Sequence, residues 1–228
     1  MPSALQEPES TRTAVGTGVY ALSELRAFVA FESVPQDGHR VPMWLKTALN
    51  PVPHQPHHTD YNFADLISLF VVRQLRAEGV EPRHIREAED YLRQKWQMDR
   101  PFVNGADIQT DGVYVWADGE IAGTPTSIEN ASKRGQLALF EPVRASLRHV
   151  HYRDTMACSW EPTRGVLLDP RIQFGEPVVA GTGIPTAAVA GIARRTDANT
   201  AAKRLGISRV AANRAVKFEA RLAAVAAS

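Results

Sequence analysis

The sequence contains a single cysteine, Cys158, so no disulfide can form within the chain. A lone thiol without a CxxC partner is typical of proteins of the reducing cytoplasm, where we expect this protein to lie. No apolar run approaches the roughly 18 residues that a membrane-spanning helix needs. Residues 1–18 carry Glu7 and Glu9 and lack an apolar segment, so we expect a disordered lead-in and not a signal peptide.

Motifs for catalysis are also missing. The run Gly181–Gly183 is not followed by the lysine and hydroxyl residue of a phosphate-binding loop, and Pro185 stands where a helix N-terminus would be needed. Nothing in the sequence around Cys158 or Ser159 marks either as a nucleophile, and no nucleophile, base and stabiliser fall together. We therefore expect no enzymatic activity and no cofactor.

Several histidines gather in one segment of the sequence. His54, His57 and His58 lie in the segment NPVPHQPHHTD, and neutral imidazole binds zinc and nickel. The prolines among them and the lack of nearby cysteine favour an exposed loop over a metal site. His149 and His151 alternate along an expected strand and would point to opposite faces. We expect no bound metal.

The charge of the chain is unevenly distributed. The formal net charge is only +1, yet residues 101–170 are mainly acidic and the last third is basic. From residue 194 onward, Asp197 and Glu219 stand against a larger set of bases: Arg194, Arg195, Lys203, Arg204, Arg209, Arg214, Lys217 and Arg221. Such a concentration is typical of surfaces that bind phosphate backbones or acidic proteins, although a merely solvated helix face has the same pattern.

The first hundred residues predict four helices. Residues 20–25 open the first, with Ser23 as its N-cap, and residues 35–38 predict a turn. A short helix is expected from Pro42 to Leu49, because proline suits a first helical position. Apolar spacing predicts two long helices over residues 63–78, capped by Asn62, and over residues 82–97.

This order of elements resembles the MerR-type DNA-binding domain. The resemblance lies in YALSEL, a short second helix, a wing, and the pair YNFADLISLFVVRQLRAEGVEPRHIREAEDYL. It implies that the second helix enters the major groove and that the wing touches phosphates. The implied DNA contacts are Arg40, Trp44 and Lys46 in the helix, and His54, His57 and His58 in the wing. A four-helix bundle without a nucleic-acid role is the alternative.

Short β-elements are expected in the middle of the chain. Val113–Trp116 stands between two Asp-Gly dipeptides and predicts a short strand or hairpin. Residues 122–135 are polar and read as a linker, and a helix is expected from Gln136 to about His149. Strands are then predicted near residues 151–152, 156–160 and 166–168.

The last third begins with a segment rich in proline and glycine, too dense in both for a helix or a regular strand. Beyond it, Ala201, Ala202 and Leu205 have the spacing of one helix, residues 206–208 that of a turn, and residues 212–216 that of a second helix. This spacing is typical of a helix-turn-helix.

The segment DPRIQFGEPVVAGTGIPT, from Asp169 to Thr186, resembles the bacterial domain of unknown function numbered 433. That domain is a winged-helix-like module typical of VapB-type antitoxins, which are encoded beside PIN-domain ribonuclease toxins. The family pattern usually has an arginine where this chain has Gly183. An ordinary loop ahead of a small helical bundle is the alternative.

Together these features predict a mainly α fold with small β elements: a MerR-like winged helix and a second winged-helix-like or helix-turn-helix module. We expect a lead-in over residues 1–18, a DNA-binding domain over 19–100, a β-hairpin and linker over 101–135, and an antitoxin module over 136–228.

The two resemblances imply an antitoxin of a type II toxin–antitoxin system, which neutralises a PIN-domain toxin and represses its own operon by binding operator DNA. We expect the N-terminal domain to bind DNA, and the basic C-terminal residues to contact toxin or DNA through Lys203, Arg204, Arg209, Arg214 and Lys217. Apolar residues at coiled-coil spacing predict a homodimer seam through Ala215, Phe218 and Leu222. The alternatives are a stand-alone MerR-type regulator that senses a ligand and a protein-interaction adaptor.

Overall fold

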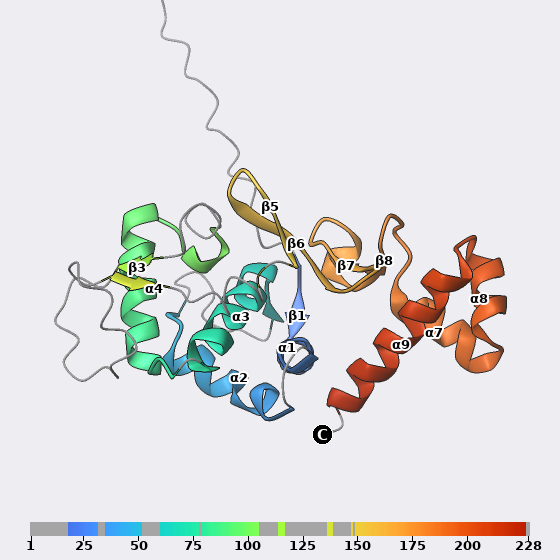
Figure 1. Cartoon of the computed structure of the whole chain (residues 1–228), viewed down its shortest axis with the longest axis horizontal. Coiled ribbons are helices and arrows are strands. Elements are labelled where there is room, and N and C mark those ends of the chain that lie inside the picture. Colours follow the sequence, from blue (N-terminus) through green and yellow to red (C-terminus); the bar gives the residue numbers. More distant parts are fainter. Residues whose placement is uncertain are drawn as a thin grey trace, which may run out of the picture.

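A computed structural model describes residues 18–31, 35–51, 60–77, 79–104, 114–116, 136–138, 147 and 149–226. In this part of the chain the fold is mainly helical, with a small antiparallel sheet, as predicted (Figure 1). No helix in these ranges has the length and apolar character needed to cross a membrane.

The N-terminal half is built on the central helix α3. Its four helices are α1 (Leu22–Phe31), α2 (Pro35–Thr47), α3 (Phe63–Ala77) and α4 (Pro82–Trp96). The predicted cap of α3 is confirmed: the Asn62 side chain accepts from the Asp65 amide at 3.0 Å, and the Asp65 carboxylate accepts from the Asn62 amide at 2.9 Å. The backbone amides of Asn62 and Asp65, both at the N-terminus of α3, are thereby satisfied. Every residue from Phe63 to Arg73 is buried, so α3 is surrounded on all sides.

The predicted turn at residues 35–38 is wrong, because these residues form the first turn of α2. Pro35 occupies the first helical position, where a missing amide proton costs nothing, and Pro42 lies inside the helix. Gly38 allows α1 and α2 to approach closely, since a Cβ there would lie 2.8 Å from the Arg26 carbonyl oxygen. Its role is therefore in packing.

The start of α1 also differs from the prediction. Ser23 lies inside the helix and is not its cap. The Glu24 carboxylate instead accepts from the Ala21 amide at 2.7 Å, which satisfies one of the free donors at the helix N-terminus.

The strands of the described residues form three separate sheets. β1 (Tyr20–Ala21) pairs with β2 (Asp60–Tyr61), and β3 (Tyr114–Trp116) pairs with β4 (Gln136–Ala138), both antiparallel. The four-stranded antiparallel sheet follows chain order: β5 (Val150–Arg153), β6 (Met156–Thr163), β7 (Val166–Leu168) and β8 (Val178–Val179). Within the described ranges the connections include the short 3-10 helices η1 (Pro101–Val103) and η3 (Gln173–Gly175). The predicted strands near residues 151, 156 and 166 are confirmed, whereas the helix predicted from Gln136 begins instead as β4.

Three helices form the C-terminal helical unit: α7 (Thr186–Arg195), α8 (Ala198–Leu205) and α9 (Arg209–Ala226). They lie at one end of the molecule, with α1–α4 at the other and the four-stranded sheet between them (Figure 1). The described residues form two apolar cores. The first joins α1–α4 to β5, β6 and β7, and the second joins α7, α8 and the first half of α9 to Val179.

The cores therefore do not divide at residue 136. Trp160 of β6 packs between the N-terminal helices, with its ring centroid 4.5 Å from that of Phe70 and 6.1 Å from that of Phe28. The sheet predicted to belong to the C-terminal module is thus anchored in the first core.

Helix α9 joins the two cores. Its second half runs back to α1, where the Phe218 and Phe31 ring centroids lie 4.9 Å apart. Arg221 donates to the Phe31 carbonyl at 2.6 Å, and its guanidinium carbon lies 4.5 Å from the centre of the Phe31 ring. The C-terminal helical unit is thereby held against the N-terminal half.

Candidate DNA interface

Local signals in the sequence fix both ends of the turn between α8 and α9. Asp197 caps α8 by accepting from the amides of Asn199 at 2.7 Å and Thr200 at 3.0 Å. Gly206 ends α8 at a φ of 66°, a conformation that glycine adopts without strain. The Ser208 hydroxyl then accepts from the Ala211 amide at 3.1 Å, so α9 begins at Arg209 as the spacing predicts.

Helix α9 buries one face and exposes the other. Its buried residues are Ala212, Ala215 and Phe218. The small alanine side chains allow the close packing of α7 and α8 on this helix. Because each residue turns a helix by about 100°, the exposed residues of the first half fall together on the opposite face. They are Arg209, Val210, Asn213 and Lys217.

The exposed charge of this unit is almost entirely positive. Arg221 is exposed but donates to the Phe31 carbonyl on α1. The other exposed cations are Arg194 and Arg195 at the end of α7, Lys203 and Arg204 at the end of α8, and Arg209 and Lys217 on α9. The two acidic residues are engaged inside the unit. Glu219 accepts from the Thr186 hydroxyl, and Asp197 accepts from the Thr200 hydroxyl at 2.7 Å. Hydrogen bonds from Thr200 hold the pKa of Asp197 below its usual value, so this cap stays ionised at neutral pH.

Four of the five C-terminal cations predicted to bind toxin or DNA are exposed: Lys203, Arg204, Arg209 and Lys217. Arg214 is half-buried and lies against the turn between β6 and β7, where a Cβ on Gly165 would be 3.3 Å from its side chain. Its guanidinium is therefore less available to a partner than the other four cations.

The predicted dimer seam is turned inward. Ala215 is fully buried in the second core, and Phe218 is only 2% exposed in the first. Leu222 is partly buried and packs against the same core as Phe218. The prediction of a homodimer through these residues is wrong, since the coiled-coil-like spacing is satisfied within the chain.

The residues predicted to contact DNA from the N-terminal half are placed differently. Trp44 is 1% exposed and belongs to the first core, so the prediction that it reads DNA is wrong. Arg40 and Lys46 are exposed on α2, and Arg40 lies 3.7 Å from the Asp37 carboxylate. The wing residues His54, His57 and His58 lie outside the described residues. The described part of this half offers little free positive charge for DNA.

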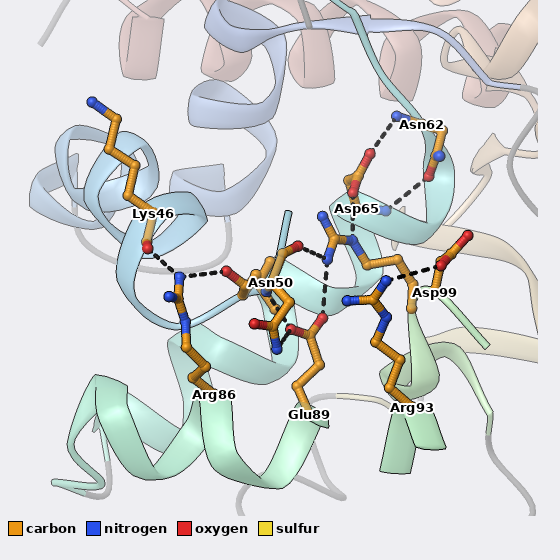
Figure 2. Close-up of polar contacts among 10 residues, drawn as sticks. Lys46, Asn50, Asn62, Asp65, Arg86, Glu89, Arg93 and Asp99 are labelled. Atoms are coloured by element: carbon orange, nitrogen blue, oxygen red, sulfur yellow. Dashed lines mark hydrogen bonds and ion pairs between the residues drawn. The ribbon is translucent and has the colours of Figure 1, made fainter. Parts of the chain in front are cut away.

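A buried polar cluster supports the N-terminal half (Figure 2). At its centre Arg100 donates to the Asp65 carboxylate at 2.7 Å, the Glu89 carboxylate at 3.0 Å and the Asn50 carbonyl at 2.6 Å. Glu89 also accepts from the Asn50 side chain at 3.1 Å. Burial raises the pKa of Glu89, and the positive charge of Arg100 opposes this shift.

The cluster joins three segments that are remote in sequence. It ties the end of the α2 region to α3 and α4, and Arg86 adds hydrogen bonds to the carbonyls of Lys46 and Leu49, the latter at 2.8 Å (Figure 2). These bonds satisfy carbonyls at the C-terminal end of α2, which a helix leaves free. Sequence reasoning missed the cluster, because no local pattern brings Asp65, Glu89 and Arg100 together. Its burial indicates a structural role.

Within the described ranges, no three His, Cys, Asp or Glu side chains lie together in an arrangement that could hold a metal ion. Cys158 is half-buried on β6 and is a free thiol. The most distinctive surface of the described residues is therefore the cationic face of the C-terminal helical unit.

Comparison with solved structures gives a likeness to the crystal structure of Rv2018 from Mycobacterium tuberculosis. The TM-score is 0.62 at 23% sequence identity, and the match covers 86% of this chain and 96% of that chain. At this identity the likeness shows the fold alone. No protein-family model matches the chain, and no curated protein matches it.

Proposed function

We propose that this protein is a DNA-binding antitoxin that represses its own operon and neutralises a PIN-domain ribonuclease toxin. In this proposal α8 and α9 form a helix-turn-helix that binds operator DNA. The observation that carries it is the exposed cationic face of the C-terminal helical unit, whose two acidic residues are both engaged in internal hydrogen bonds. Placing DNA here revises the expectation that the N-terminal half binds it.

The distribution of exposed charge favours the C-terminal unit over the N-terminal one. On α2 the exposed cations are Arg40 and Lys46, and Arg40 has Asp37 beside it. Besides Arg221, which donates to the Phe31 carbonyl, the C-terminal unit exposes six cations on three adjacent helix segments. Each phosphate that a cation neutralises contributes about −0.9 to the slope of log affinity against log salt. If four of the six engage phosphates, the slope is roughly −3 to −4.

The toxin part of the proposal is supported by the resemblance of residues 169–186 to the antitoxin-associated domain. A second feature favours a protein partner. Phe174 is 76% exposed and Val19 is 57% exposed, and the Val19 amide donates to the Phe174 carbonyl at 3.2 Å. Exposed aromatic and apolar residues set side by side are typical of protein contact sites.

DNA binding is tested by fluorescence anisotropy with duplex DNA from upstream of the gene, measured over a series of salt concentrations. We expect salt-sensitive binding that reversal of charge at Arg204 and Arg209 to glutamate weakens at least tenfold. Arg83→Glu is the matched control, because Arg83 is an exposed arginine on α4 that is paired with Glu81 at 2.8 Å, remote from the proposed face. No binding even at low salt eliminates the DNA-binding proposal.

Toxin neutralisation is tested by co-expression with the neighbouring gene. We expect the protein to restore growth and to co-purify with that gene's product. Failure of both measurements leaves either a stand-alone regulator or an adaptor. Phe174→Ser, which removes the exposed ring, is expected to weaken co-purification without affecting DNA binding.

A further inference from the structure

The exposed face of α9 carries chemically varied side chains over its first half. Arg209, Val210, Asn213 and Lys217 occupy this face. Beyond them it continues with Ala220 and Ala224, and with Arg221, which donates to the Phe31 carbonyl on α1. Long and polar side chains thus gather next to the turn, where the second helix of a helix-turn-helix meets the DNA.

Val210 is the most unusual member of this set. It is 57% exposed, one of four large hydrophobic residues that are strongly exposed among those described. A β-branched residue at an exposed helical position is disfavoured by its restricted side chain, so neither helix formation nor core packing accounts for it. In the major groove the apolar group on offer is the methyl of thymine, which an exposed valine matches.

The neighbouring side chains have complementary chemistry. Asn213 lies about 60° around the helix from Val210. Its amide nitrogen can donate to N7 of an adenine while its amide oxygen accepts from the N6 amino group, as a bidentate pair. Arg209 lies on the other side of Asn213 and can donate twice to a guanine edge. Arg209, Val210 and Asn213 can therefore contact a guanine edge, a thymine methyl group and an adenine edge, respectively.

Reading bases also requires a fixed helix. The first half of α9 is held by Ala212 and Ala215 in the second core, and its second half is held on α1 by Phe218 and Arg221. Both ends of the helix are thus fixed within one chain. The exposed side chains are presented on a rigid element, which reduces the entropy lost on binding.

We propose that Arg209, Val210 and Asn213 read base edges in the major groove of duplex DNA, with Asn213 reading an adenine. Lys203, Arg204 and Lys217 contact phosphates and supply affinity without sequence preference. This assignment rests on the proposed DNA-binding function and adds to it which side chains confer sequence specificity. It predicts a site with an A·T pair next to the thymine whose methyl group contacts Val210.

The experiment begins with a pool of duplexes that carry a randomised central segment. The intact protein is used to select bound sequences from this pool, and each variant is measured on the selected duplex and on an unselected duplex. We expect Asn213→Ala to lose about 5- to 150-fold in affinity for the selected duplex, the range for one bidentate base contact. Its affinity for the unselected duplex should change less than twofold.

Lys217→Gln is the matched comparison, because Lys217 lies on the same exposed face one helical turn further on. It should weaken binding to both duplexes alike and reduce the salt slope by about 0.9. A repeat selection with Asn213→Ala should return sequences in which a single base-pair position has lost its preference. Asn213 is exposed, so a thermal melt should show both variants folded.

The outcomes separate the two proposals. If the unmutated protein binds no duplex at low salt, the DNA-binding function itself fails. If it binds but selects no preferred sequence, or if Asn213→Ala selects the same sequence with the same preference, the base-reading assignment is overturned and the DNA-binding function stands.

Discussion

Replacing Phe218 with alanine is the perturbation that tests the connection between the two cores most directly. Phe218 is 2% exposed, and its ring packs on that of Phe31 at a centroid distance of 4.9 Å. The rest of the buried face of α9, including Ala212 and Ala215, belongs to the second core. Removing the ring therefore damages the attachment of α9 to α1 and leaves the packing of α7, α8 and α9 on one another unchanged.

The expected loss in the free energy of unfolding is large compared with the stability of an ordinary folded protein. Truncating a buried phenylalanine to alanine destabilises a protein by about 3–5 kcal/mol through lost burial and the cavity left behind. The ring contact with Phe31 accounts for about 0.5–1.5 kcal/mol of this. Because folded proteins are stable by only about 5–15 kcal/mol, this loss is enough to uncouple the two cores.

Urea denaturation followed by two probes measures the effect. Trp44 and Trp160 lie in the first core, so tryptophan fluorescence follows it, whereas far-ultraviolet circular dichroism follows helices of both cores. In the unmutated protein we expect coincident transitions, and in Phe218→Ala a lower midpoint by fluorescence and separated transitions. Val210→Ala on the same helix is the control and should shift stability by less than about 0.5 kcal/mol. A shift of less than about 1 kcal/mol in Phe218→Ala would refute the reasoning, as would transitions that remain coincident.

Further predictions concern glycine packing, helix capping and backbone strain. Gly38→Ala should lower the melting temperature, because the new methyl group would lie 2.8 Å from a backbone oxygen. Gly191→Ala on α7 should raise the free energy of unfolding by up to about 1 kcal/mol, because no atom lies nearer than 3.9 Å to the new methyl group. The pKa of Asp197 is lowered in the folded state, so its contribution to stability is present above pH of about 4 and is lost as the pH falls through the folded pKa. The melting temperature of the unmutated protein should therefore fall more steeply below pH of about 4 than that of Asp197→Asn, and parallel curves would contradict this. Phe174 has a φ of 54° and is mostly exposed, so Phe174→Asn should raise the melting temperature, since asparagine tolerates this conformation and little burial is lost.

Those parts of the fold that depend on neighbouring residues could be predicted from the sequence. The caps and apolar spacing around Asn62 and residues 63–77 predict α3, and the glycine and serine that bracket residues 206–208 predict the turn before α9. In each case the residues that predict the element lie within one or two helical turns of it. The strands β6 and β7 were also predicted, because their apolar runs are bounded by turns.

Parts that depend on remote residues could not be predicted. A Pro-Gln-Asp-Gly sequence is compatible both with a turn and with the start of a helix. In the structure it starts α2, which packs closely on α1 at Gly38, a contact that no local pattern predicts. The strand β4 exists through its pairing with β3, about twenty residues earlier in the chain. The buried polar cluster around Arg100 joins residues from three separate segments, so no local spacing identifies it.

The prediction of a dimer seam is wrong for the same reason, because the residues that bury this face of α9 are remote in sequence. Periodic spacing on α9 shows that one face is buried, but it does not show what buries it. In the structure Ala215 is buried by α7 and α8, and Phe218 by α1. A single helix face is thus divided between two cores, while the opposite face of the first half carries the proposed DNA contacts. Any partner that displaces α1 therefore also disturbs the support of the helix that carries Arg209, Val210 and Asn213, because α9 is one continuous helix from residue 209 to residue 226.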